Sequence, residues 1–473
     1  MAMELFYFEQ LLSHAVARQP DFRIQRLLVD ADYPVAICYL ETLIDKAQLQ
    51  QTVLLPLMDI RFDGEMESGD KVQFIRGKLA GAPPIEAPAA AADALVSAIL
   101  EGNCIVFLRD NNGFALDIGE AKHRGIQEPK SEKTVRGPGE AFTEDVMTNV
   151  SLIRNRIKTP QLAFEAFEIG TLTKTKVLMA YIEGKASPER IAAYRERLSR
   201  IQTEAVLEGA NVEEWIEEKQ LTPFPRVLNT ERPDVLSAHL IEGKIAILAD
   251  GSPDCLIVPV TFFQFFISAE DYYQPPLFAT LLRWLRLLAF VLAVYTPGMY
   301  IALTNYRQEM IPSALLVNLA AQREGVPFPA FVEAIIMLVM FELLREAGIR
   351  MPSVTGQAIS IVGAVVLGQA AVEAGLVSAA MVIVVGITAI ANFVTPSFTF
   401  GMAQRVLQFA FMVLAVGLAL FGMFCGTLLM AIHLVSLKTT GEPYLTPLAP
   451  AKPSDFKDSL FRVPWYDMKN PKR

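Results

Sequence analysis

Hydrophobic residues are distributed unevenly along this chain of 473 residues. Long apolar segments follow one another from about residue 281 to residue 437, whereas the first 250 residues alternate short apolar runs with charged ones. A membrane-spanning helix requires roughly 20 mostly apolar residues. Four segments approach or exceed that length, at residues 285–303, 356–372, 379–393 and 406–437. The pattern predicts an α-helical membrane bundle preceded by a large soluble domain.

The soluble part shows two successive α/β patterns. In the first, residues 34–40 are strand-like, residues 43–58 have helical spacing, and strand-like runs at 104–108 and 114–118 flank a polar turn. In the second, strand-like runs at 177–182 and 244–249 accompany helical patterns at 188–207 and 212–218. The fold class we predict is therefore an α/β cytoplasmic N-terminal domain of two subdomains, followed by a transmembrane helical bundle.

Composition shifts set the expected domain boundaries. The polar, turn-rich stretch 128–138 separates the two subdomains, and an aromatic run at 257–267 precedes the first long apolar segment. That run is too short to span a membrane, so it is either interfacial or a core strand. The expected domains are residues 1–138, 139–276, 277–437 and a cytoplasmic tail at 438–473.

Charges near the apolar segments predict the orientation. Arg283 and Arg286 open the first long apolar segment, and the tail carries seven basic residues against four acidic ones, so both ends are expected in the cytoplasm. The first 20 residues have charged side chains within their apolar stretch and predict an amphipathic helix, not a secretory signal. Residues 328–348 are long enough to span but contain Glu333 and Glu342, which are costly at the bilayer centre. We favour four crossings, and five with an external tail is the alternative.

Composition also argues against several classes of function. The formal net charge of −9 argues against a nucleic-acid partner. The four cysteines are scattered without a CxxC pair, and no phosphate-binding loop, nucleophile elbow or HExxH motif is present in the sequence. We therefore predict no catalytic residues, no cofactor and no metal site.

Several polar strings resemble the A subunits of GerA-type spore germination receptors. They are RGPGE at 136–140, TERPDV at 230–235, DGSP at 250–253, EMIP at 309–312, REGVPFP at 323–329, LREAGIRMP at 344–352, GQAISIVG at 356–363 and GEPYLTPLAP at 441–450. The strings occur in order over nearly the whole chain. The SpoVAF-like paralogues share much of this pattern and remain an alternative.

The resemblance implies a non-enzymatic receptor subunit in the spore inner membrane, where a transporter-like B subunit and a lipoprotein C subunit are its partners. It also implies assembly with itself, as a pentamer, into an ion channel that nutrients open. From the residues alone, two other classes stay open: a secondary transporter, and a membrane-anchored sensor or scaffold that does not conduct.

Residues 355–373 have a pattern that suits a pore. At about 100° per residue, six side chains fall within about 40° of one line along a helix. They are Thr355, Ile359, Val362, Val366, Gln369 and Glu373. Repeated around a ring, polar ends and an apolar middle would form a hydrophobic constriction between polar vestibules. The alternative is a stripe that faces lipid or the protein core.

Two further groups of residues accompany this stripe. A neighbouring face carries small residues that predict close helix packing, namely Gly356, Ser360, Gly363, Ala364 and Ala371. Glu333 and Glu342 either line an ion path or pair with nearby arginines.

Overall fold

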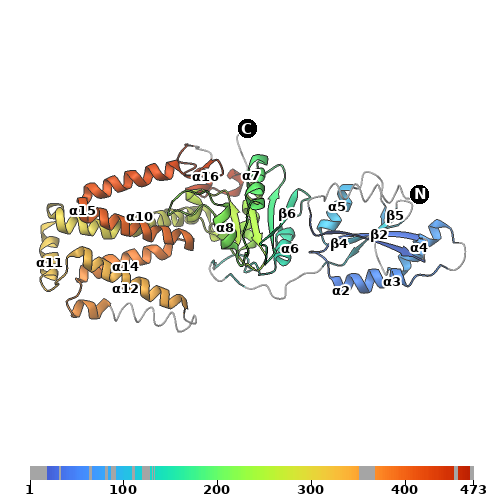
Figure 1. The fold of residues 1–473 in the computed structure, drawn as a ribbon, viewed down its shortest axis with the longest axis horizontal. Coiled ribbons are helices and arrows are strands. Elements are labelled where there is room, and N and C mark those ends of the chain that lie inside the picture. The colour runs from blue at the N-terminus through green and yellow to red at the C-terminus, as the bar shows by residue number, and fades with distance from the viewer. Residues whose placement is uncertain are drawn as a thin grey trace. The chain divides into compact units, whose positions relative to one another are not determined.

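The computed structural model describes residues 19–30, 33–62, 66–79, 84–86, 92–108, 112–119, 128–129, 132, 134–350, 368–451 and 456–468. The chain forms two compact units. The α/β unit comprises Met1–Glu218 and Val227–Pro259, and the helical unit comprises Lys219–Arg226 and Val260–Arg473. Figure 1 shows the strands in the α/β unit and the long helices in the helical unit. The predicted fold class, an α/β N-terminal part followed by a helical region with apolar helices, is confirmed. The cytoplasmic placement, the membrane crossings and the four domain boundaries stay predictions.

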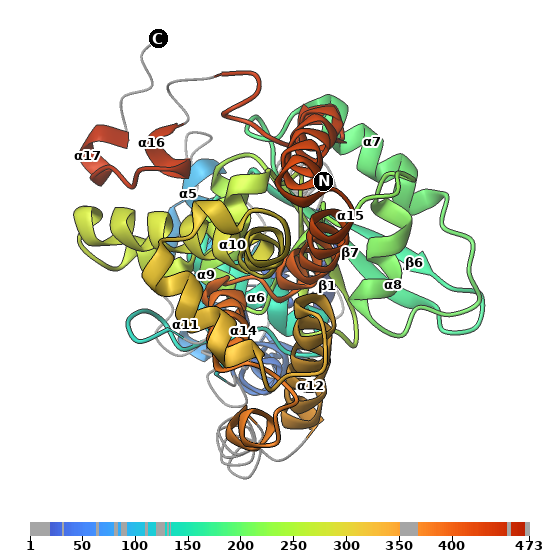
Figure 2. The same ribbon diagram turned by 90° about the vertical axis from the view of Figure 1, so that its left-hand side faces the viewer.

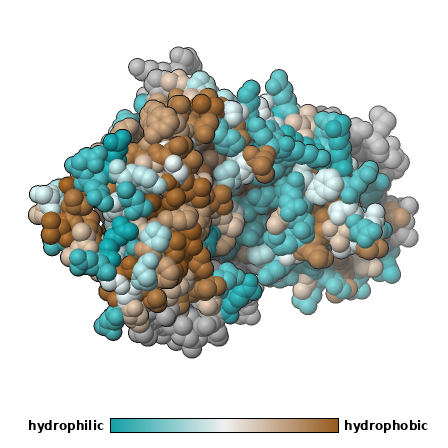
Figure 3. Space-filling model, turned by 60° about the vertical axis from the view of Figure 1, so that its left-hand side comes forward, coloured by the Kyte–Doolittle hydropathy of each residue, from teal (hydrophilic) through white to brown (hydrophobic). Residues whose placement is uncertain are grey.

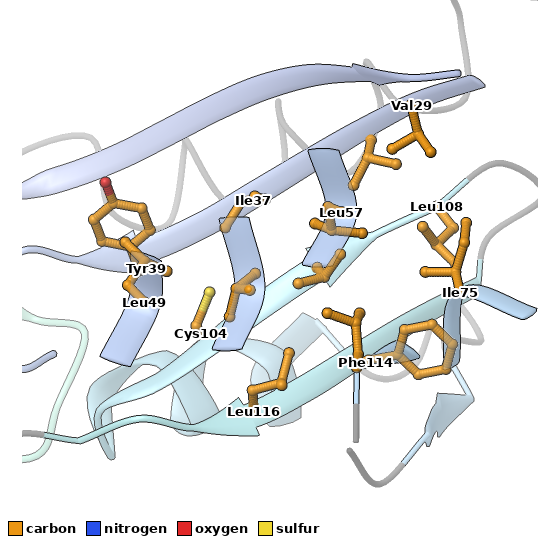
Figure 4. Packing of buried hydrophobic residues seen from close by; sticks show 14 of the residues in the cluster. Val29, Ile37, Tyr39, Leu49, Leu57, Ile75, Cys104, Leu108, Phe114 and Leu116 are labelled. Carbon is orange, nitrogen blue, oxygen red and sulfur yellow. The ribbon is translucent and has the colours of Figure 1, made fainter. Parts of the chain in front are cut away.

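The first sheet of the α/β unit is antiparallel, with strand order β1-β2-β4-β5-β3. Its strands are β1 (Phe22–Val29), β2 (Tyr33–Leu40), β3 (Pro84–Glu86), β4 (Asn103–Phe107) and β5 (Asn112–Asp117). Helix α2 (Lys46–Gln48) leads into the π-helix η1 (Leu49–Leu54). Odd-numbered residues of β2 pack against η1, α3 (Leu55–Met58) and α4 (Ser68–Lys78), and Figure 4 shows part of this packing. Even-numbered residues pack against α5 (Ala92–Leu100) on the other face. Because both faces are covered, β2 is apolar throughout.

The second sheet is also antiparallel, with strand order β6-β7-β9-β10-β8. Its strands are β6 (Leu162–Ile169), β7 (Thr175–Ile182), β8 (Leu228–Thr230), β9 (Ile245–Ala249) and β10 (Cys255–Val258). Helices α7 (Pro188–Ser199) and α8 (Gly209–Ile216) cover one face, and α6 (Val146–Arg156) and α9 (Pro233–Ile241) cover the other. Strand β10, the last strand of the α/β unit in the chain, lies between β9 and the edge strand β8 and joins them.

The aromatic run at 257–267 divides between the two units. Its first residues are in β10, so this part is a core strand. Beyond Pro259 the chain enters the helical unit, where a 3₁₀ turn, η3 (Phe262–Phe266), buries four phenylalanines, and a second turn, η4 (Ala269–Tyr272), follows. These turns lead into the first long helix.

The helical unit is built around α10 (Pro276–Tyr306), which packs against α14 (Ala379–Val394) and α15 (Phe398–Ser436). Figure 2 views this unit from the end at which α11 (Ser313–Arg323) and α12 (Ala330–Arg350) are seen. Helix α12 packs mainly on α14. The unit also contains a short β11–β12 hairpin (Lys438–Thr439 and Glu442–Pro443), α16 (Phe456–Ser459) and α17 (Trp465–Met468).

Within the part of the chain that the structure describes, α10 and α15 are the two helices long and apolar enough to cross a membrane, and α14 is a shorter apolar helix. Large hydrophobic side chains on their outer faces are exposed, including Leu281, Leu285, Ile387, Val413 and Phe424. Figure 3 shows the broad hydrophobic surface over these helices. A surface of this kind fits lipid contact. The number of crossings remains a prediction, because residues 351–367 lie outside the described ranges.

Helix α15 is not one straight helix. Ala419 has φ 51° and ψ −139°, so the chain bends there and two arms result, Phe398 to Leu418 and Leu420 to Ser436. The bend has no signal in the sequence, since neither Gly nor Pro occupies position 419 and the apolar run is continuous. The single apolar run at 406–437 is therefore folded back on itself.

Candidate functional site in the helical unit

Most of the predicted pore stripe lies outside the described residues. This applies to Thr355, Ile359, Val362 and Val366, and to Gly356, Ser360, Gly363 and Ala364 of the packing face. The end of the stripe is described: Gln369 and Glu373 are exposed on one helical turn, and the Gln369 amide donates to the Glu373 carboxylate at 2.8 Å. Ala371 of the packing face is buried. The roles of these residues stay predictions.

Glu333 connects three elements of the helical unit. It lies in the first turn of α12 and is fully buried. One carboxylate oxygen accepts from the Ser378 backbone N–H at 2.8 Å, just before α14. The other lies 3.8 Å from Nε of Arg323 in α11. A buried carboxylate requires such partners because its desolvation is costly.

Glu342 lies between two arginines. Its carboxylate pairs with Arg345 in its own helix, and Nη1 of Arg405 in α15 donates to it at 3.2 Å. Both acidic residues that the sequence offered as ion-path candidates therefore contact arginine. Their carboxylates link α12 to its neighbours, and their role in an ion path stays a prediction.

The two arms of α15 and helix α10 approach one another at glycines. A Cβ on Gly422 would lie well inside the contact distance of the Leu414 carbonyl oxygen, and one on Gly426 would lie 2.6 Å from Cδ1 of Leu414. On α10, a Cβ at Gly298 would lie 3.2 Å from the Phe411 carbonyl oxygen. At Gly422 the two arms approach backbone to backbone, so this glycine sets their spacing, whereas Gly426 and Gly298 allow close side-chain and interhelix contacts.

A polar and an aromatic contact fix the same packing. The Tyr295 hydroxyl lies 2.8 Å from Oγ1 of Thr427 in the second arm. The Tyr295 ring lies 4.6 Å from the ring of Phe411 in the first arm. One residue of α10 thus contacts both arms of α15.

An aromatic cluster packs the middle of α10 against η3 and the start of the first arm of α15. Phe400 of α15 lies at its centre, and its ring is 5.0 Å from Phe266, 5.3 Å from Phe265, 5.5 Å from Phe262 and 5.6 Å from Phe290. Aromatic pairs at these separations add to the stabilisation from burial alone. The cluster joins η3, α10 and α15.

Buried charges lie beside this cluster at the start of α10. Asp271, fully buried, accepts from Nε of Arg283 at 3.1 Å and from Nη1 of Arg286 at 2.8 Å. Arg283 also contacts the backbone and carboxylate of Asp458 in α16, and the Tyr272 hydroxyl donates to that carboxylate at 3.0 Å. Arg283, one of the two arginines that indicated a cytoplasmic start of α10, thus also attaches the tail to it.

In the α/β unit, two of the polar strings meet at one arginine. Arg232 of the TERPDV string donates from Nη2 to the Pro138 carbonyl of the RGPGE string at 3.0 Å, and pairs with Asp234 at 2.8 Å. Beside it, Glu132 accepts from the Thr230 hydroxyl at 2.6 Å. Burial raises the pKa of Glu132 to about 7. The two strings, which are far apart in the sequence, therefore contact each other in the folded α/β unit.

The family model described as Bacillus/Clostridium GerA spore germination protein matches residues 10–473. The chain belongs to the GerA family. Spore germination protein KA of Bacillus subtilis (strain 168) is 42% identical over 440 residues, which cover 92% of this chain and 80% of that protein. Uncharacterized membrane protein YfkQ of the same organism is 44% identical over 375 residues, 79% of this chain and 73% of that protein.

A solved structure is also similar to this GerA family chain. It is the crystal structure of the N-terminal domain of the A subunit of the Bacillus megaterium spore germinant receptor GerK3, with 29% sequence identity and a TM-score of 0.42. The likeness covers 54% of this chain and 94% of that one.

Several residues that organise this GerA family chain were not predicted from the sequence. Gly422 and Gly426 form a GxxxG pattern, which is a known signal of close helix packing. Gly298 had no such signal, because its partner Phe411 is distant in sequence. Asp271 precedes its partners Arg283 and Arg286 by 12 and 15 residues, a spacing that is not a recognisable motif. Arg154 likewise pairs with Asp21 at 2.6 Å in the α/β unit, with both side chains buried.

Proposed function

We propose that this chain is the A-type subunit of a spore germinant receptor, and that its copies form a pentameric ion channel of the spore inner membrane that nutrients open. The family match carries the proposal, since it extends over both the α/β unit and the helical unit. A transporter-like B subunit and a lipoprotein C subunit would complete the complex. The chain's own residues act in assembly and conduction, not in catalysis.

The helical unit supplies the physical support for conduction. By length and composition α10 and α15 could span, with α15 bent at Ala419 into two arms, and the exposed apolar faces of both helices suit lipid or another copy. A single chain with few spans encloses no aqueous path, so a pore would be shared between copies. Mass measurement in nanodiscs tests the assembly: a pentamer is expected, and monomer alone under several mild conditions contradicts it.

The proposed pore lining is the stripe from Thr355 to Glu373, with Val362 at its narrowest part. Val362→Ala removes two methyl-sized groups per copy, each contributing about 0.8 kcal/mol of apolar burial, and a ring multiplies the effect. We expect leaky channels and premature germination, with a stronger effect for Val362→Ser because a hydroxyl wets the constriction. Val365→Ala removes the same groups about 80° from the centre line of the stripe and is the matched control. Normal dormancy and a normal nutrient response in both Val362 variants, at normal abundance, would remove Val362 from the gate.

Two experiments separate the proposal from its alternatives. In planar bilayers, the purified protein should give steady unitary currents; slow coupled flux would indicate a transporter, and neither signal a sensor or scaffold. In spores, deletion of the gene should abolish the response to at least one nutrient. Unchanged responses to all nutrients would instead favour a role like that of the SpoVAF-like paralogues.

A further inference from the structure

Eight residues from the middle of the α/β unit belong to the helical unit. The segment Lys219–Arg226, here called the inserted segment, leaves the α/β unit after Glu218 and returns to it at Val227. Phe224 of this segment is 2% exposed. Its ring lies 6.0 Å from Phe262 and 6.2 Å from Phe400, so it belongs to the aromatic cluster described above.

Polar contacts attach the inserted segment to the end of α15. Oγ1 of Thr222 lies 2.9 Å from Nε2 of His433, in the last turn of the second arm. The Tyr444 hydroxyl, beyond that arm, donates to the Pro225 carbonyl at 2.7 Å. The Phe224 ring stacks on the His433 ring at 6.3 Å. In addition to its place in the aromatic cluster, the segment thus contacts the last turn of the second arm and the chain just beyond it, by packing and by hydrogen bonds.

Both ends of the inserted segment are tied into the α/β unit. It follows α8, whose last residue, Ile216, accepts from Nη1 of Arg197 in α7 at 2.5 Å. It precedes β8, where Asn229 donates to Glu213 of α8 at 3.2 Å. In the sheet register Leu228 of β8 lies opposite Ile257 of β10. The chain passes between the units three times, after Glu218, before Val227 and after Pro259. The second passage leads into the start of β8 and the third follows the end of β10, and these two strand ends lie side by side in the sheet.

We propose that the inserted segment is the element that couples the α/β unit to the second arm of α15. A single flexible linker would let one unit change without the other. Here a shift of α8 or β8 must displace Phe224 from its aromatic packing or carry His433 with it. A close-packed core has discrete arrangements and resists gradual deformation, so the coupling favours one of two positions of the arm.

This proposal rests on the proposed function for its physiological meaning, since the arm belongs to the unit that would conduct. The decisive variant inserts two glycines between Lys219 and Gln220, both of which are exposed. It lengthens the connection and leaves Phe224 in place. The matched control inserts two glycines between Glu183 and Gly184, in an exposed turn of the α/β unit. Thr222→Val and Tyr444→Phe each remove one hydroxyl of the attachment, and Leu221→Ala, at a fully exposed position, is their control.

We expect the Lys219 insertion to shift the nutrient concentration for half-maximal germination at least about tenfold, or to cause germination without nutrient, at unchanged protein abundance. The control insertion and Leu221→Ala should leave that concentration unchanged. Thr222→Val and Tyr444→Phe should shift it in the same direction as the Lys219 insertion. Equal responses of the Lys219 insertion and the control would overturn the coupling, while wild-type complementation would leave the proposed function intact.

A second measurement does not depend on germination. In the purified full-length protein, His433→Ala should increase amide hydrogen exchange in α8 and β8, although His433 belongs to the other unit. Ser436→Ala, on an exposed residue one turn further along, is the control. Unchanged exchange in α8 and β8 would contradict the coupling even if the chain served no germination function.

Discussion

Gly422 shows how a single missing side chain determines a packing. Replacing glycine by alanine within a helix ordinarily stabilises by about 0.5–1 kcal/mol. At Gly422 the added Cβ meets the Leu414 carbonyl oxygen, and overpacking of this kind costs about 1–3 kcal/mol. The second effect is larger, so the close approach, not helix propensity, explains the glycine.

We therefore expect Gly422→Ala to lower the thermal stability of the detergent-purified protein. Gly417→Ala is the matched control, since nothing lies within 4 Å of a Cβ built there in the same helix. The control should be neutral or stabilising. Equal melting temperatures for Gly422→Ala and wild type would show that the arms of α15 are not in close contact at this point.

Glu213 gives a pH dependence whose sign follows from burial. Burial, with Glu217, Glu208 and Asp254 nearby, raises its pKa from 4.5 to about 7. Between pH 4.5 and about 7 the Glu213 carboxyl is therefore protonated in the folded state and ionised in the unfolded state. Its contribution to the free energy of unfolding falls as the pH rises through this range. Glu213→Gln should flatten that part of the profile, as measured by urea unfolding at several pH values. Glu214→Gln, on an exposed neighbour, should leave it unchanged; a profile that keeps its slope in Glu213→Gln would contradict the assignment.

At the scale of elements, the tail depends on a few polar contacts at the start of α10. Asp458 accepts from the Tyr272 hydroxyl and contacts Arg283, and its side chain is 37% exposed. Hydrogen bonds to charged groups contribute about 1.5–3 kcal/mol when buried, and partial exposure reduces this contribution.

Asp458→Ala should consequently release the tail, which limited proteolysis would detect as faster cleavage after residue 450. Asp467→Ala changes an exposed aspartate of α17 and should not alter the rate. Unchanged cleavage in Asp458→Ala would mean that other contacts, such as the ring contact of Trp284 with Phe461, hold the tail.

The helices and strands that could be predicted from the sequence were those with a local periodic pattern of apolar residues. Strands β2, β4 and β5 were predictable, because alternation and the polar turn before Phe114 are local signals. The bend at Ala419 was not, because it lies inside an uninterrupted apolar run. The place of Phe224 among the phenylalanines of η3 and α15 was equally hidden, since contacts between distant segments leave no periodic pattern. The charges of Glu333 and Glu342 were visible in the sequence, but their arginine partners in α11 and α15 were not.

At the scale of the whole molecule, the limits of the α/β unit define a fragment that should fold alone. The sheet needs β10 to hold the edge strand β8, and Asp21 pairs with the buried Arg154. We expect residues 19–259 to unfold in one cooperative transition in urea, followed by circular dichroism. Residues 19–250, which lack β10, should be less stable or not cooperative. A disordered spectrum for the longer fragment would contradict an independent α/β unit.

The inserted segment has a consequence for how chains of this family can be recombined. A chimera joined once, at Pro259, would combine the helical unit of one parent with an inserted segment from the other, and Phe224 would face an aromatic cluster with which it did not evolve. If Lys219–Arg226 is exchanged together with all residues after Pro259, Phe224 and the aromatic cluster on which it packs come from the same parent. The helical unit of this chain is therefore encoded by two separate stretches of its gene, and both must be exchanged to transfer the unit intact.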